Sequence, residues 1–197
     1  MTAALVAGGG MVALVDVLTG PGFQIVLPRI TPNISPAPGQ DDDLLGIYIS
    51  SLRALADIPA EEVLPAHEYR FAGLTRRING LLGHHEERLG VVMTVVHAAS
   101  GCTSVAVAEA LTWSRPWDQM VGPQRRFAIG EAFSHLVHLE RTGYLVNKGL
   151  DPNGAGVDSW FPLRDTVPKL LQGWSRRVCR TGRARFWPVQ SSPFTAA

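Results

Sequence analysis

Hydrophobic residues recur at three- and four-residue spacings in three stretches of the chain, and this pattern predicts three amphipathic helices. The helices are expected at about residues 42–56, 74–99 and 124–141. Glycines at positions 80, 83 and 90 allow a bend in the second one. The apolar face of the first helix is predicted to consist of Leu44, Ile47, Tyr48, Leu52 and Leu55. That of the last is predicted to consist of Ile129, Ala132, Phe133, Leu136 and Leu139.

Capping and stop residues set the expected ends of these helices. The Asp41–Asp43 run favours a helix start, because carboxylates accept hydrogen bonds from free N–H groups and suit the positive end of the helix dipole. Thr103 or Ser104 is expected to cap a short helix at residues 105–111. Gly143 supplies a stop after residue 141. The segment 113–123 is predicted to be a loop.

Four short apolar runs predict strands. They lie at residues 11–18, after a glycine triplet, and at residues 25–27, 61–65 and 144–146. The proline-rich segment at residues 29–40 is expected to be extended loop. Helix, short helix, loop, longer helix and strand, from residue 74 onward, is the element order of a winged helix-turn-helix.

Charge and composition exclude several classes of protein. Eighteen basic and seventeen acidic residues nearly cancel, which excludes a histone-like or polyacidic chain. Two cysteines are too few for a disulfide scaffold, so a reduced, cytoplasmic setting is expected. The start lacks a basic signal region and an uninterrupted apolar span, so no membrane association is expected. Seven bases and one acid between Arg164 and Arg185 predict a basic, partly disordered tail over residues 150–197.

Three groups of residues together resemble one known family. They are Val26–Ser35 with Pro38–Gln40, then Val63–His67, and finally His85–Leu89 with Gln124–Ala128, Gly130–Glu131 and His135–Leu136. This combination resembles the C-terminal half of a metallo-β-lactamase-fold hydrolase, of the subgroup with an appended winged-helix domain. The resemblance covers about residues 26–144.

The resemblance implies an α+β fold: a partial metallo-β-lactamase αββα sandwich over residues 1–73, followed by a mostly helical winged-helix domain over residues 74–149. In such hydrolases two metal ions, usually zinc, supply hydroxide near neutral pH and polarise the substrate. Relatives act on small-molecule esters or thioesters, or on RNA, so the substrate class stays open. An oligomer is compatible with the sequence.

The metal ligands that the family needs are mostly missing from this sequence. His67 matches the last metal-ligand histidine, in the loop after the run 61–65. Gln24 stands where the bridging Asp is expected, and Ile25 stands where a neighbouring His is often found. No H-x-H motif occurs among the six histidines. We therefore expect a chain truncated at its N-terminus, with an incomplete metal site, His67 as its one assigned ligand, and no catalysis alone.

Other candidate sites have plainer explanations. His84–Glu86 could ligate a metal, but adjacent helical residues point about 100° apart, so a solvated polar face is expected. His135 and His138 could meet with Glu131 on one face of a helix, and ordering of the winged-helix surface is expected instead. Trp113 and Trp117 are expected to pack against the domain core rather than stack on a nucleic-acid base.

The sequence is compatible with two further hypotheses. The winged helix could be a nucleic-acid- or protein-binding module, although residues 103–150 carry only five bases against four acids, which is not the footprint of duplex binding. Alternatively, the chain has no independent function, and an incomplete sheet makes it poorly soluble.

Overall fold

The computed structural model describes residues 31–36, 42–63, 65, 69–149 and 157–163, and the backbone of residues 5–8 and 11–14. His67, Gln24, Ile25, the predicted strand at residues 25–27 and the basic tail from residue 164 lie outside these residues. Within them, no helix is both long enough and apolar enough to cross a membrane.

All four predicted helices are present. They are α1 (Leu44–Ala56), α2 (Leu74–Ala98), α3 (Ser104–Ala110) and α4 (Pro123–Arg141). The Asp43 carboxylate accepts a hydrogen bond from the Gly46 N–H at 2.8 Å and so caps α1. Thr103 caps α3 in the same way, through the Ala106 N–H at 3.1 Å. The segment expected to be a loop contains one short 3-10 helix, η1 (Trp117–Gln119).

The described strands form two separate antiparallel hairpins. The first pairs β1 (Leu5–Gly8) with β2 (Met11–Leu14), which agrees with part of the predicted strand at residues 11–18. The second pairs β3 (Leu145–Asn147) with β4 (Trp160–Pro162). The predicted domain boundary at residue 149 therefore falls inside this second hairpin.

The prediction of an extended strand at residues 61–65 was wrong. In the described part of this segment, only Val63 pairs, and it forms an isolated bridge with Phe71. Two backbone hydrogen bonds, at 2.8 and 3.2 Å, make up this bridge. An apolar run becomes a longer strand only where a neighbouring strand can take up its backbone groups.

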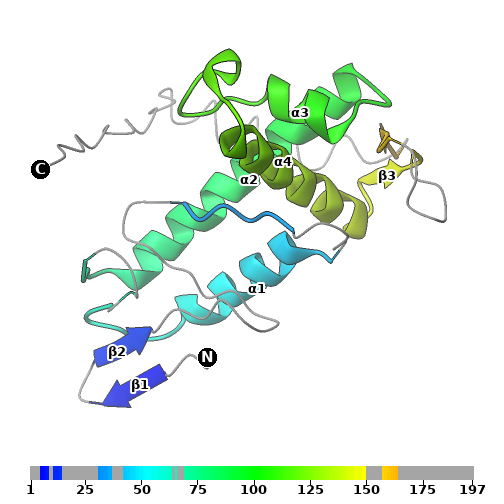
Figure 1. Ribbon diagram of the computed structural model, residues 1–197. Coiled ribbons are helices and arrows are strands. Elements are labelled where there is room, and N and C mark those ends of the chain that lie inside the picture. The colour runs from blue at the N-terminus through cyan, green and yellow to red at the C-terminus, as the bar shows by residue number, and fades with distance from the viewer. Residues whose placement is uncertain are drawn as a thin grey trace, which may run out of the picture.

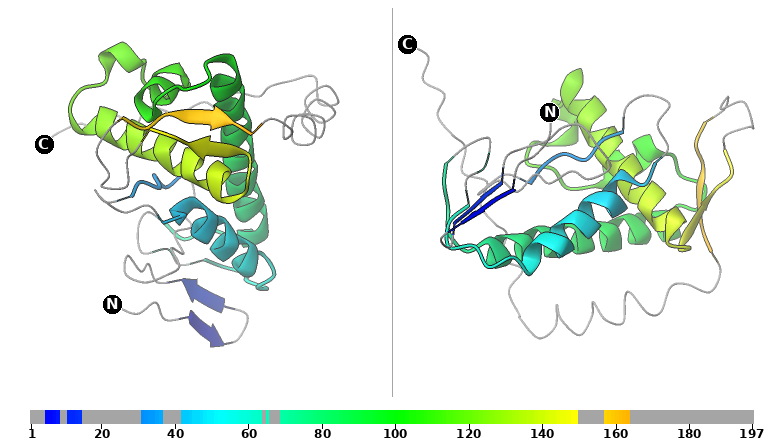
Figure 2. Two further views of the ribbon diagram at one scale, coloured as in Figure 1. Left: turned by 90° about the vertical axis from the view of Figure 1, so that its right-hand side faces the viewer. Right: turned by 90° about the horizontal axis from the view of Figure 1, so that it is seen from below.

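Two apolar clusters lie along α2, one at each half of the helix. The first cluster joins α1, the first half of α2 and nearby segments, and its buried residues are Ile34, Leu44, Leu45, Tyr48, Ile49, Leu52, Leu55, Val63, Leu74, Ile78 and Leu81. The second joins the rest of α2 to α3, α4 and the hairpin β3–β4, and its buried residues are Val92, Met93, Val96, Val107, Ala108, Leu111, Ala132, Leu136, Val137, Leu139, Leu145 and Trp160. Figures 1 and 2 show α2 running past both groups of elements.

The buried face of α1 is wider than the sequence pattern predicted. Leu45 and Ile49 are also buried, whereas Ile47 is only partly buried. The reason is that α1 contacts both α2 and α4, so two sides of the helix are covered. Similarly, Ile129 and Phe133 of α4 are only partly buried, whereas the polar residues His135 and Ser134 are buried together with Ala132, Leu136 and Leu139.

Candidate functional site

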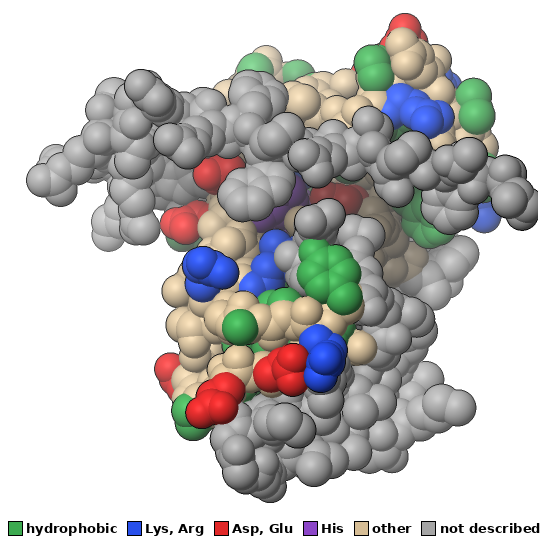
Figure 3. All heavy atoms as spheres, turned by 90° about the vertical axis from the view of Figure 1, so that its left-hand side faces the viewer, with side chains coloured by type: hydrophobic (Ala, Val, Ile, Leu, Met, Phe, Trp, Pro, Cys, Tyr) green, Lys and Arg blue, Asp and Glu red, His purple; other side chains and the backbone are tan. Residues whose placement is uncertain are grey.

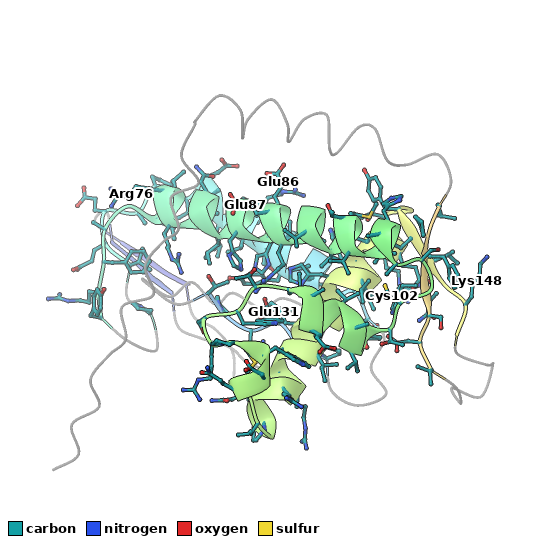
Figure 4. All side chains as sticks on the ribbon, turned by 90° about the horizontal axis from the view of Figure 1, so that it is seen from above. Arg76, Glu86, Glu87, Cys102, Glu131 and Lys148 are labelled. Carbon is teal, nitrogen blue, oxygen red and sulfur yellow. The ribbon has the colours of Figure 1, made fainter. Side chains whose placement is uncertain are left out.

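Polar side chains from four segments meet between the two apolar clusters, where α2 and α4 face each other. We call this group the polar seam. It consists of His85 and Arg88 of α2, Glu131, His135 and His138 of α4, Asp43 at the start of α1, and Asn33 of the segment 31–36. In Figure 4, Glu131 lies inside the helical assembly, whereas Glu86 and Glu87 lie on the outer side of α2.

A pair of buried histidines forms the centre of the seam. His85 is 1% exposed and His135 is 0% exposed, and His85 Nδ1 lies 3.3 Å from His135 Nε2. His135 Nδ1 lies 2.7 Å from the Glu131 backbone oxygen, which can only accept a hydrogen bond. His135 therefore carries its proton on Nδ1, and its Nε2 accepts a hydrogen bond from His85 Nδ1–H.

These hydrogen bonds leave one ring nitrogen, His85 Nε2, without a described hydrogen-bond partner. With its proton on Nδ1, His85 has an unprotonated Nε2, and this buried atom has no hydrogen-bond partner in the described part of the chain. Burial, with smaller contributions from nearby His84, Arg88 and His138, lowers the pKa of His85 to about 3. Burial likewise lowers the pKa of His135 to about 3, against the raising effect of the bond to the Glu131 backbone. Both imidazoles are therefore neutral at pH 7.

A buried ion pair lies beside the histidines. Arg88 Nη2 is 3.3 Å from Glu131 Oε1, and the two side chains are 15% and 12% exposed. Arg88 also donates to the Thr112 carbonyl at 2.8 Å, and its guanidinium stacks over the Trp113 ring at 4.5 Å. Burial raises the pKa of Glu131, while the Arg88 guanidinium opposes that shift. Arg88 therefore connects α2, α4 and the loop after α3.

Asn33 fixes the segment 31–36 to the Glu131 carboxylate. Its Nδ2 donates to Glu131 Oε2 at 3.0 Å and to the Phe127 carbonyl at 3.2 Å. The Ser35 hydroxyl donates to the side-chain oxygen of Asn33. In the sequence, this segment begins a few residues after Gln24, the position where the bridging Asp of the family is expected. The seam therefore anchors the chain shortly after that position.

The third link of the seam joins α1 to α4. His138 Nδ1 lies 2.9 Å from Asp43 Oδ2 and 3.1 Å from Oδ1, and the same carboxylate caps α1. The two side chains are 17% and 24% exposed. One aspartate thus both starts α1 and fastens it to α4.

The structure changes two expectations about histidines. The predicted solvated face at His84–Glu86 was wrong for His85, because α4 covers that side of α2. His135, His138 and Glu131 were expected to order the winged-helix surface, and they instead bond His85, Asp43 and Arg88 on other elements. No group of three His, Cys, Asp or Glu side chains in the described residues could hold a metal ion. His67, the predicted ligand, lies outside those residues.

Sequence reasoning missed the roles of Asn33, Asp43 and Arg88 in the seam. No local pattern marks them, because their partners lie 43 to 98 positions away. One signal did exist. Asn33 and Arg88, like His85, Glu131 and His135, belong to the stretches that carry the family resemblance.

The segment 31–36 and the start of α1 cover one side of α4, the helix that would read DNA in a winged helix-turn-helix. At Gly130, a Cβ atom would lie 2.6 Å from the Ser35 hydroxyl, and α1 contacts the same helix through Asp43 and His138. A helix that reads DNA needs a free face to enter the major groove. Apart from Arg141 at its last position, the exposed residues of α4 lie at its start and include Arg125, Arg126 and Phe127.

The predicted packing of the two tryptophans was correct. Trp113 and Trp117 are partly buried against the second cluster, and Trp113 Nε1–H donates to the Ala108 carbonyl at 2.7 Å. Arg125 lies over the Trp117 ring at 5.2 Å.

On the face shown in Figure 3, acidic and basic side chains are interspersed, and histidine atoms lie recessed among them.

Several solved structures are similar to this one, among them two from bacteria. A β-lactamase domain protein from Burkholderia ambifaria is 28% identical and matches with a TM-score of 0.62, over 77% of this chain and 41% of its own length. A metallo-β-lactamase family protein from Thermus thermophilus is 22% identical, with a TM-score of 0.58, over 78% of this chain and 42% of its own. The chain therefore spans less than half the length of these proteins.

No protein-family profile and no curated protein matches the sequence of this chain. The likeness to the first structure covers most of this chain, and the second shows the same fold. Both results agree with the family resemblance found in the sequence. Over the matched part, the chain therefore has the fold of the metallo-β-lactamase family proteins.

Proposed function

We propose that this chain serves in a metallo-β-lactamase-like, metal-dependent hydrolase and does not complete a metal centre by itself. The observation that carries the proposal is the likeness to the Burkholderia ambifaria β-lactamase domain protein over 77% of this chain. The chain corresponds to only 41% of that protein, so the activity of the whole is not inherited from the match.

The described residues do not fit a zinc centre of the family type. They contain no group of three metal-binding side chains, and the polar seam is already occupied by its own hydrogen bonds. Among the other residues, His67 is the one ligand at the expected place, and Gln24 is a neutral amide where a carboxylate is needed to bridge two cations. No catalytic step is assigned to this chain for that reason.

Zinc analysis of the purified chain tests the incomplete site. After dialysis, we expect much less than one zinc per chain, with the same value for His67→Ala and for the control His97→Ala. We also expect no hydrolysis of ester, thioester or RNA substrates. Stoichiometric zinc that is lost in His67→Ala alone, together with hydrolysis, would show that the site is complete.

A chimera tests the hydrolase assignment itself. The chain would replace its matched segment in the Burkholderia ambifaria protein, once with Gln24 and once with Gln24→Asp. We expect the Gln24→Asp chimera to hold more zinc than the unaltered one, because a carboxylate can bridge two ions. Equal zinc content in two folded chimeras would argue that this segment does not face a metal centre.

A second candidate function is binding of single-stranded nucleic acid at the corner between α3 and α4. Arg115, Arg125 and Arg126 are exposed there, beside the Trp117 ring and Phe127. Guanidinium and aromatic groups suit phosphates and unstacked bases. The covered side of α4 argues against binding of a duplex by this helix.

Binding of a labelled single-stranded RNA, measured by fluorescence anisotropy, tests this second function. We expect salt-sensitive binding that weakens in Arg125→Ala/Arg126→Ala and is unchanged in the control Arg53→Ala, which alters an exposed arginine of α1. Lack of binding at low salt would remove the candidate.

A further inference from the structure

The position of the histidine pair sets it apart from the rest of the interior. Leu81 belongs to the first cluster and Val92 to the second, and His85 lies between them on α2. His85 bonds His135 across the space between α2 and α4, and the Tyr48 ring of α1 meets the His85 ring edge-on at 5.6 Å. Three helices therefore meet at two neutral imidazoles.

The pair has no place for an added proton. His135 uses both ring nitrogens, one toward the Glu131 carbonyl and one toward His85. A proton on His85 Nε2 would produce a buried cation with no described acceptor. Solvation of such a cation requires the helices to separate.

The charged groups around the pair do not compensate for that cation. On α2, His84 and Arg88 both disfavour positive charge on His85. On α4, Glu131 is bonded to Arg88 and Asn33, and His138 faces Asp43. On α1, Tyr48 presents its ring and Asp43 is bonded to both Gly46 and His138. Both described carboxylates near the pair are thus held by other partners.

We propose that the His85–His135 pair is an acid-sensitive joint: proton uptake by the pair breaks the contact between α2 and α4 and lets the first cluster separate from the second. As the pH falls below the value at which free histidine titrates, opening of the joint costs progressively less free energy. In the opened form, α1 and the segment 31–36 are released from α4, while α3, the hairpin β3–β4 and the second half of α2 retain their apolar packing.

The direction of the pH effect follows from linkage. The pKa of both histidines is about 3 in the folded chain and 6.5 in free histidine, so the unfolded chain binds more protons between these values. Stability supplied by the neutral pair is complete above pH 6.5 and falls as the pH drops toward 3. Between pH 6 and 5, two such groups lower the ratio of folded to unfolded chain roughly 60-fold.

Urea unfolding of the full chain at pH 7, 6 and 5 tests this dependence. Relative to the double variant His85→Gln/His135→Gln, the wild-type ratio of folded to unfolded chain is expected to fall roughly 60-fold more between pH 6 and 5, and a single variant roughly 8-fold more. The control His97→Gln keeps the wild-type dependence. Identical pH dependence in the wild type and the double variant would overturn the proposal.

Two measurements on the wild type apply even if the variants do not fold. Nitrogen-15 NMR should show both rings in the neutral form with the proton on Nδ1 down to about pH 4, and ordinary titration near 6.5 would overturn the proposal. Hydrogen exchange at pH 5, corrected for the intrinsic rate, should show amides of α1 opening before those of α3. Opening of both regions together would contradict separation of the clusters.

Discussion

At the scale of single residues, the polar seam depends on a few side chains that each bond several elements. Glu131 accepts from Arg88 and from Asn33, and its backbone oxygen accepts from His135. Arg88 and Glu131 are largely buried, at 15% and 12% exposed, so removal of one member of this pair should destabilise the fold, because the remaining partner stays desolvated. The seam is therefore sensitive to single substitutions.

The Arg88–Glu131 pair gives a direct test of this sensitivity. Arg88→Met should lower the free energy of unfolding by roughly 2–4 kcal/mol, since it leaves the Glu131 carboxylate buried without its cation. Arg88→Met/Glu131→Gln should lose less than the sum of the two single changes. Urea unfolding of the four chains would measure the coupling, and additive losses would mean that the pair is not coupled.

At the scale of elements, close contact between the segment 31–36 and α4 explains why a glycine lies within a long helix. A Cβ atom at Gly130 would lie 2.6 Å from the Ser35 hydroxyl oxygen and 2.8 Å from the Ser35 Cβ. By contrast, a Cβ atom at Gly83 of α2 would meet nothing within 4 Å. The two helical glycines therefore have different roles.

Substitution by alanine should separate these roles. Gly83→Ala should raise the free energy of unfolding by about 0.5–1 kcal/mol, because alanine loses less backbone entropy in a helix. Gly130→Ala should lower it by roughly 1–3 kcal/mol through overpacking. Thermal or urea unfolding measures both, and Ser35→Gly should rescue part of the Gly130→Ala loss. A stabilising Gly130→Ala would show that the segment yields easily.

At the scale of the whole molecule, the hairpin β3–β4 closes the second cluster with residues from late in the chain. Trp160 is 1% exposed, packs edge-on against Phe133 and donates from Nε1 to Asp158 at 2.8 Å. The same Asp158 oxygen accepts from the Ser104 N–H at the start of α3. Loss of this tryptophan should therefore affect α3 and α4 together.

Trp160→Ala should lower the free energy of unfolding by about 3–5 kcal/mol, and Trp160→Phe by less, in proportion to the buried ring that remains. Urea unfolding gives the overall loss, and hydrogen exchange locates it. Protection is expected to fall first in α3, whose N–H group at Ser104 loses its ordered acceptor. Unchanged protection in α3 would contradict the coupling through Asp158.

Helices were predictable because their signals are local. Periodic apolar positions and the caps Asp43 and Thr103 act within one or two turns, so the helix bounds agree closely with the expected ranges. Strands were less predictable, since a short apolar run such as residues 61–65 depends on whether another strand is available. The tertiary packing also decided that Leu45 and Ile49 are buried, because α4 covers a second side of α1.

The sequence by itself determined the four helices, the stop at Gly143 and the motifs that resemble the metallo-β-lactamase fold. It also determined that few metal ligands are available, because residue types can be counted without a structure. Only the tertiary structure decided that His85 is buried and bonded to His135, 50 positions away. The physical reason is that burial of a polar side chain depends on partners brought together by packing, and no local pattern records them.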